Sequence, residues 1–250
     1  MGTLPTEAYL DALRRDGPAL ADAAERAGLS TEVVACPGWT VAELLWHTGE
    51  VHDFWREVVD RQAADPNEAR PEDPPRPPND ELLDWYRDGV ERLHATLAAA
   101  DPAASVWTWT PQKDVACVRR RMAQETAVHR WDAEQSAAIE HAIEPGLAVD
   151  GIDEFVRFFL PLKRDDAERL GGSVHLHCTD ADGEWLIEQP EGEEWLAVSP
   201  HHAKGDVAAR GTASDLLLVL WRRRSPADVD VFGDGRILER FLAWTDLDEH

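Results

Sequence analysis

The sequence predicts an α+β protein, with a four-helix bundle in residues 1–145 and a smaller α+β domain in residues 146–250. Two observations lead to this division. Apolar residues recur at intervals of three and four through most of the first segment, which is the spacing of one helix face. Beyond Pro145 and Gly146, short stretches alternate between apolar and polar residues, which is typical of half-buried strands. A helix bundle followed by a small sheet covered by helices accounts for both patterns.

Four helices are expected in the first segment. The segments with helical periodicity are 6–27, 41–64, 79–100 and 115–140. Thr40 and Glu43 form a capping-box sequence before the second helix, because each side chain can satisfy a backbone donor of the first turn. Residues 65–78 contain six prolines, so we expect a stiff, exposed connection without helix.

The second segment mixes both periodicities. Helical spacing is present over residues 150–162, after the helix-breaking pair Pro145 and Gly146. The expected strands are 173–179, 184–189, 194–199, 207–210 and 229–232. Thr212 is expected to cap a helix, and a last helix is expected over 236–244.

Composition excludes several classes of partner. The chain has 25 basic and 49 acidic residues, and its net charge of −24 repels nucleic acid and anionic membrane surfaces. The arginine runs 119–121 and 222–224 are short and are expected to be solvated helix ends.

Neither a secretory leader nor an apolar run long enough to cross a bilayer is visible, and the three cysteines are widely spaced. We therefore expect a cytoplasmic protein with reduced thiols.

Three polar residues occupy positions where the helices should present core residues. His47 lies in the apolar stripe of the second helix, and Glu125 and His129 share the inward face of the fourth. Burying such groups without partners costs several kcal/mol, and a shared cation would compensate them. Two imidazoles and a carboxylate are a common ligand set for catalytic zinc, although nickel and iron suit the same donors. Asp132 is a candidate to orient a ligand ring, and the alternative is a helix cap or a salt bridge to Arg130 or Arg119.

Other histidines are expected to be solvated. His52 and His94 lie off the apolar stripes of their helices. His175 and His177 share one face of a strand and are spaced to chelate a cation, but a solvated strand face is the favoured interpretation.

Four stretches carry a resemblance to a known family: CPGWTVAELLWHTGEVHDFW, QETAVHRWDAE, ARGTASDLLLVLWRRR and VDVFGD. Together they resemble the mycothiol-dependent maleylpyruvate isomerase family over nearly the whole chain. The resemblance implies a DinB-like metal-binding bundle followed by an α+β domain similar to sterol carrier proteins. It also implies that His47, Glu125 and His129 are metal ligands and that the thiol mycothiol is a cofactor.

The chemistry implied by the resemblance starts from a thiol that the cation deprotonates. In the isomerase, the thiolate adds to the double bond of maleylpyruvate, permits rotation and leaves again. The same centre suits transfer of the thiol to an electrophile, and a non-catalytic small-molecule or lipid-binding protein with a structural or vacant metal site is the alternative. Arg222 or Arg223 matches the region in which the family holds the substrate carboxylate, although an arginine replaces the usual small residue after Trp221. The expected partners are the thiol and an electrophilic substrate, and both a monomer and a homodimer are compatible with the sequence.

Overall fold

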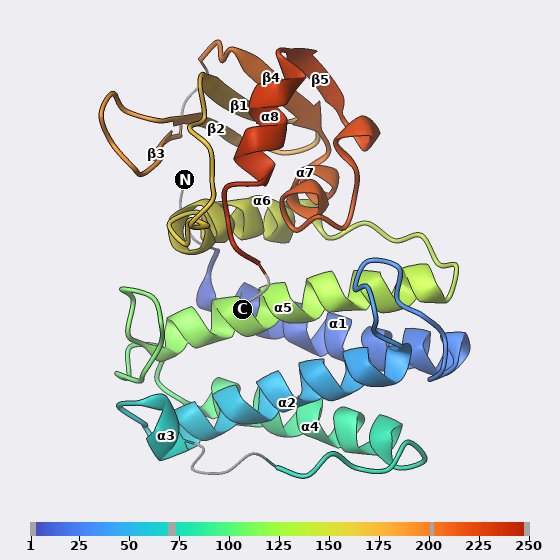
Figure 1. Cartoon of the computed structure of the whole chain (residues 1–250). Coiled ribbons are helices and arrows are strands. Elements are labelled where there is room, and N and C mark those ends of the chain that lie inside the picture. The colour runs from blue at the N-terminus through green and yellow to red at the C-terminus, as the bar shows by residue number, and fades with distance from the viewer. Residues whose placement is uncertain (1–3, 70–73, 201–202, 248–250) are drawn as a thin grey trace. The chain divides into compact units, whose positions relative to one another are not determined.

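The computed structural model describes residues 4–69, 74–200 and 203–247. They divide into two compact units, with residues 4–141 in one and residues 142–247 in the other (Figure 1). The first unit is helical and the second combines helices with a mixed sheet. The predicted order of a helical region followed by an α+β region is confirmed.

The first unit is built on long helices that pack along one another. They are α1 (Thr6–Ala27), α2 (Val41–Asp60), α4 (Leu82–Ala99) and α5 (Val115–Ser136), with a short α3 (Pro66–Ala69). Helix α1 packs against α4 and α5, and α2 packs against the same two helices. Apolar side chains of all four long helices fill the interior, which places the inward faces of α2 and α5 opposite each other.

Side-chain caps fix where the site-bearing helices begin. Thr40 and Glu43 form the predicted capping box at the start of α2, and the Thr40 hydroxyl also contacts the Glu43 carboxylate. The hydrogen bond from Thr40 is the larger of two influences that lower the pKa of Glu43, and the nearby Arg76 guanidinium is the smaller. Together they lower this pKa to about 2, although partial burial acts to raise it. Helix α5 begins after Asp114, whose side chain accepts a hydrogen bond from the amide of Cys117 at 2.9 Å.

The prediction that residues 119–121 form a solvated helix end is wrong, because all three arginines are buried. The guanidinium of Arg119 donates to the carbonyl oxygens of Leu97 at 2.6 Å and Ala100 at 2.9 Å. These carbonyls belong to the last turn of α4 and its cap, where helix carbonyls lack backbone partners. A charged side chain is therefore drawn into the bundle by acceptors that the α4 backbone leaves open.

The second unit contains a five-stranded sheet among its described residues, with strand order β3-β2-β1-β4-β5. The strands are β1 (Ser173–Cys178), β2 (Glu184–Glu188), β3 (Ala197–Ser199), β4 (Val207–Gly211) and β5 (Asp230–Gly233). Strand β1 runs parallel to β4, and the other pairs are antiparallel. The helices are α6 (Pro145–Glu154), which continues into a π-helix over Phe155–Phe159, then α7 (Ala213–Leu220), a 3-10 turn over Pro226–Asp228 and α8 (Gly235–Leu242).

The helices of this unit pack on one face of the sheet. The indole of Trp185 on β2 donates to Asp153 of α6 at 2.8 Å, and the α-carbon of Gly172 lies against Ile237 of α8. These positions share a face with the buried Val174 and Leu176 of β1, because side chains alternate along a strand. The opposite face therefore carries the remaining side chains of β1, including its two histidines.

Two expectations about proline are corrected. Pro145 begins α6 instead of breaking a helix, because proline is favoured in the first helical turn, where its missing amide hydrogen costs nothing. Glu144 caps that turn by accepting from the amides of Gly146 and Leu147. The connection over residues 65–78 contains the short helix α3, which also starts at a proline, Pro66; residues 70–73 of that connection lie outside the described part. Within the described residues, no helix combines the length and the apolar character needed to span a membrane.

Candidate metal centre

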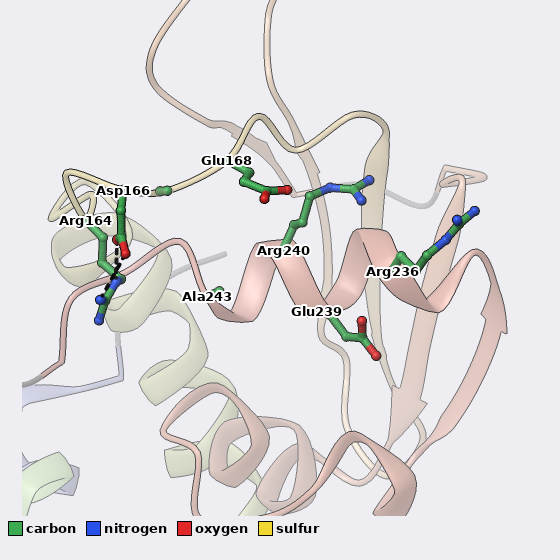
Figure 2. Close-up of a pocket in the computed structure, with 8 residues that line it drawn as sticks. Arg164, Asp166, Glu168, Arg236, Glu239, Arg240 and Ala243 are labelled. Atoms are coloured by element: carbon green, nitrogen blue, oxygen red, sulfur yellow. Dashed lines mark hydrogen bonds and ion pairs between the residues drawn. The ribbon is translucent and has the colours of Figure 1, made fainter.

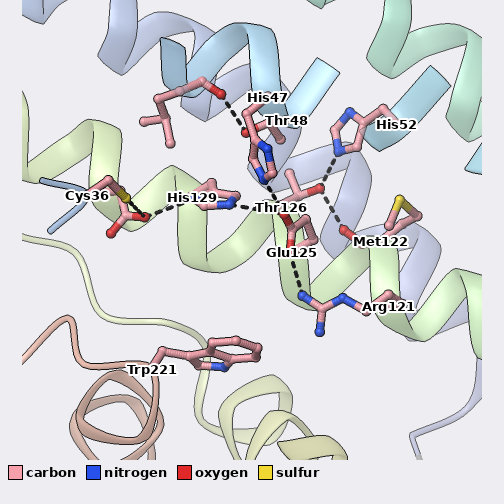
Figure 3. Close-up of polar contacts among 12 residues, drawn as sticks. Cys36, His47, Thr48, His52, Arg121, Met122, Glu125, Thr126, His129 and Trp221 are labelled. Carbon is pink, nitrogen blue, oxygen red and sulfur yellow. Dashed lines mark hydrogen bonds and ion pairs between the residues drawn. The ribbon is translucent and has the colours of Figure 1, made fainter. Parts of the chain in front are cut away.

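Helices α2 and α5 bring His47, Glu125 and His129 together (Figure 3). The Oε1 atom of Glu125 lies 3.3 Å from Nε2 of His47 and 3.0 Å from Nε2 of His129. Two ligand atoms on one tetrahedral zinc ion are separated by about 3.3 Å, since each bond is about 2.0–2.1 Å long. The three side chains therefore present their donor atoms at a spacing that suits one small cation.

The position of His47 follows from two parts of the sequence. Its place on α2 directs the ring toward α5, and Trp39, from the turn before α2, packs against it with ring centroids 4.8 Å apart. The His47 side chain is one-third exposed, whereas that of His129 is 7% exposed. The cluster is thus partly exposed at His47 and buried at His129.

Asp132 holds the ring of His129. The Nδ1 atom of His129 donates to the Asp132 carboxylate at 2.9 Å, which leaves Nε2 as the nitrogen that faces Glu125. The thiol of Cys36 also lies 3.8 Å from the same carboxylate oxygen. A carboxylate behind a histidine fixes the ring orientation and raises its basicity, which is how ligand histidines are supported in metal sites.

Arg121 holds the other ligand of α5. Its guanidinium donates to Oε2 of Glu125 at 2.6 Å, one turn away on the same helix, and it is itself buried. This contact occupies one carboxylate oxygen and leaves Oε1 to the two imidazoles. Neither the spacing of residues 119–121 nor their charge indicated this role, because it depends on the rotamer of a long side chain.

The charges of the cluster are strongly coupled. Burial acts to raise the pKa of Glu125, but His129, His47 and Arg121 together hold it well below its ordinary value. Burial likewise acts to lower the pKa of His129, but Glu125 and Asp132 outweigh burial and raise it to about 9. The metal-free cluster therefore favours an anionic Glu125 beside a protonated His129, and a cation must displace that proton to bind.

The prediction that His52 is exposed is wrong. This residue is fully buried on α2, and its Nε2 atom lies 2.8 Å from the hydroxyl of Thr126. Burial, which outweighs attraction by Glu125, lowers the pKa of His52 to about 4. The helical spacing carries a signal for this burial, because His52 lies three residues before the buried Trp55 and seven after the buried Leu45.

The predicted arginines have contacts within the C-terminal unit. The Arg222 guanidinium donates to the carbonyl oxygens of Leu242 at 3.0 Å and Thr245 at 2.6 Å. Arg223 donates to the carbonyl oxygen of Trp221 at 2.9 Å. Their assignment to a substrate carboxylate stays a prediction.

The C-terminal unit also has an open cavity of about 560 Å³ beside α8 (Figure 2). Three arginines and three acidic residues line it, together with two alanines, so its charges are balanced. Arg164 pairs with Asp166 at 2.9 Å, and Arg240 donates to the carbonyl oxygen of Leu170 at the same distance. These internal contacts make the cavity a weaker candidate for chemistry than the cluster between α2 and α5.

Two family models of known proteins together match most of the chain. The family model for the mycothiol maleylpyruvate isomerase N-terminal domain matches residues 10–134, and that for the MDMPI C-terminal domain matches residues 146–240. Two crystal structures of mycothiol-dependent maleylpyruvate isomerase, one of a histidine-to-alanine mutant, each superpose with a TM-score of 0.61 at 14% identity, and each comparison covers 92% of this chain and 95% of the other. No curated protein sequence gives a significant match. Because both family models match in the family's own order, the chain belongs to the mycothiol maleylpyruvate isomerase family.

Proposed function

We propose that this protein is a metal-dependent isomerase of the maleylpyruvate type that uses mycothiol. In this proposal, residues 1–145 form the metal-binding domain, residues 146–250 form the second domain, and His47, Glu125 and His129 hold a divalent cation such as Zn²⁺, Ni²⁺ or Fe²⁺. The observation that carries it is the convergence of Glu125 Oε1 with the Nε2 atoms of both histidines. Membership of the family supplies the class of reaction.

A divalent cation held by these ligands supplies Lewis acidity that favours the thiolate form of a thiol at an open position. The protein's own residues prepare that position. Asp132 keeps a proton on Nδ1 of His129, so that the lone pair of Nε2 is available. Arg121 balances the Glu125 charge from the side away from the histidines. The lowered pKa of His52 keeps this residue neutral near neutral pH, so that it adds no positive charge beside the three ligands.

The proposal keeps the S-transferase reaction as a distinct outcome. Isomerisation requires that the thiol add to the substrate double bond, permit rotation and then leave. A transferase stops after the addition, or displaces another group, and releases a thioether. The two activities therefore differ in whether the thiol is recovered.

The test is a paired measurement of metal content and turnover. We expect purified protein to hold one cation between α2 and α5, and to convert maleylpyruvate to its trans isomer only when mycothiol is present. His129→Ala should lose both properties. His94→Ala, which removes a histidine from α4, a helix without ligands, is the matched control and should keep them.

Other outcomes are equally informative. A stable thioether product would replace the isomerase with an S-transferase. A bound cation without any thiol-dependent turnover, or no cation at all, would favour a binding protein with a structural or vacant site. Unchanged cation binding between α2 and α5 in His129→Ala would remove the assignment of the ligands.

A further inference from the structure

A second group of metal-ligating side chains lies in the C-terminal unit, on the sheet face opposite the helices. His175 and His177 are alternate residues of β1, so both side chains point to that face. Glu184 of β2 is paired directly with His177 in the antiparallel register. Directly opposite residues bring their side chains within contact distance, so the sheet itself places these three groups together.

The donor atoms of this group converge. Nδ1 of His177 lies 2.7 Å from Oε1 of Glu184, and Nε2 of His175 lies 3.8 Å from Oε2 of the same carboxylate. One ligand atom from each of the three residues falls within 4.8 Å of the other two. A single carboxylate therefore faces two imidazoles, which is the donor set of the cluster between α2 and α5.

The burial of the three side chains forms a gradient. His175 is 6% exposed, which corrects the expectation of a solvated strand face, while the side chains of His177 and Glu184 are 31% and 25% exposed. The donor of His175 is thus the most buried of the three, and those of His177 and Glu184 lie nearer the surface. The side chains of His177 and Glu184 are therefore the partly solvent-exposed part of this group.

We propose that His175, His177 and Glu184 form a second divalent-cation site, independent of the site between α2 and α5. Imidazole nitrogen with one carboxylate oxygen selects zinc-like ions of the first transition row over magnesium or calcium. The bound ion joins β1 to β2 beside the turn over residues 179–183. Because it binds only where both strands are formed, it raises the stability of the folded sheet.

The competing explanation is a row of polar side chains that needs no cation. Across the sheet, Glu184, His177, Arg210 and Asp230 occupy directly paired positions on β2, β1, β4 and β5. In that explanation, His177 and Glu184 only form a hydrogen bond that stabilises the pairing of β1 with β2. Arg210 also places a positive charge next to His177, which lowers the affinity for a cation. Measured cation stoichiometry separates the two explanations.

The experiment is a zinc titration of the full-length, metal-stripped protein against a chromophoric chelator near pH 7.5. We expect wild type to bind two equivalents of Zn²⁺. His177→Gln and Glu184→Gln should each weaken one equivalent by about tenfold or more, since a ligand should matter at least as much as its supporting residues. His129→Ala should lose the other equivalent, and His94→Gln should keep both.

The two sites can fail separately. Retention of two tight equivalents in both His177→Gln and Glu184→Gln, or a wild type that binds one equivalent lost in His129→Ala, would overturn the second site. A wild type with one equivalent that is lost in His177→Gln and kept in His129→Ala would support it while removing the function proposed above.

Should a substitution unfold the sheet, the His129→Ala protein supplies the decisive measurement. Cu²⁺ bound to it should show an electron paramagnetic resonance spectrum with two histidine nitrogens, and Zn²⁺ should raise its unfolding midpoint. A spectrum without nitrogen coupling would contradict the assignment.

Discussion

The two histidine clusters of this chain have the same donors on different scaffolds. On α5, Glu125 and His129 are four residues apart, and His47 joins them from a second helix. On β1, His175 and His177 are two residues apart, and Glu184 joins them from a neighbouring strand. Each spacing is one period of its scaffold, so both pairs converge for the same geometric reason.

The clusters differ in what surrounds them. Asp132 orients a histidine in the helical cluster, and Arg121 holds its carboxylate. In the sheet cluster, the neighbour of His177 on β4 is the exposed Arg210, whose positive charge opposes a cation. Because the two donor sets are the same, we expect the supporting residues to set the difference in cation affinity, with the helical cluster binding more tightly.

The largest expected effect comes from removing a ligand of the helical cluster. In His129→Ala, affinity for Zn²⁺ between α2 and α5 should fall by more than about 100-fold, because a ligand and its orienting carboxylate are uncoupled together. The equivalent bound to the sheet should be unchanged. Chelator competition measures both constants. Loss of both equivalents would mean that the clusters are not independent.

A second effect concerns the proton that the helical cluster holds without metal. The pKa of His129 is raised in the folded chain to about 9 from 6.5, so its contribution to stability is complete below pH 6.5 and is lost as pH rises toward 9. That interval corresponds to at most about 3 kcal/mol. Urea unfolding of metal-free protein at pH 6 and pH 9 should show this loss. His129→Gln should lack it, and an equal loss in that variant would assign the effect to other groups.

A smaller effect tests the support around the ligands. Asp132→Asn keeps an acceptor for Nδ1 of His129 but removes the charge, so Zn²⁺ affinity at the helical cluster should drop by about tenfold, within the range for such partners. Isothermal titration checks this value against the sheet cluster in the same protein. No change in affinity would show that Asp132 serves only the fold.

The smallest effect is an improvement of the weaker cluster. Arg210→Ala removes the positive neighbour of His177 and should raise Zn²⁺ affinity on the sheet by about two- to fivefold, as expected for a solvent-exposed charge. The gain should shrink at high salt, because exposed charges are screened. A gain at the helical cluster, measured in the same titration, would contradict the local explanation.

Much of the fold followed from local signals. The end of α1 was predicted to the residue because Gly28 follows it, and the start of α2 was predicted from its capping box. The start of α6 was missed because a proline favours the first turn of a helix as much as it disfavours the interior. Sequence alone does not tell which of these two positions a proline occupies.

The ligands of the candidate site were predictable from the sequence, but the residues around them were not. Helical phasing singled out His47, Glu125 and His129, and the structure places them in contact. It did not reveal the role of Arg121, because that contact depends on the rotamer of a long side chain. The burial of His52 was missed although its spacing from the buried Leu45 and Trp55 indicates it. Pair spacing is a property of one helix, whereas burial is a property of the packing of several.

The division of ligands between helices has a consequence for folding. Glu125 and His129 need only a formed α5 to be neighbours, but His47 reaches them only when α2 is docked in the correct register. A slip of α2 by one turn would move His47 by about 5.4 Å, beyond bonding distance. Tight binding of a cation therefore reports that α2 is docked in its correct register on α5, and chelation would remove this one link between the two helices while the apolar core still holds them.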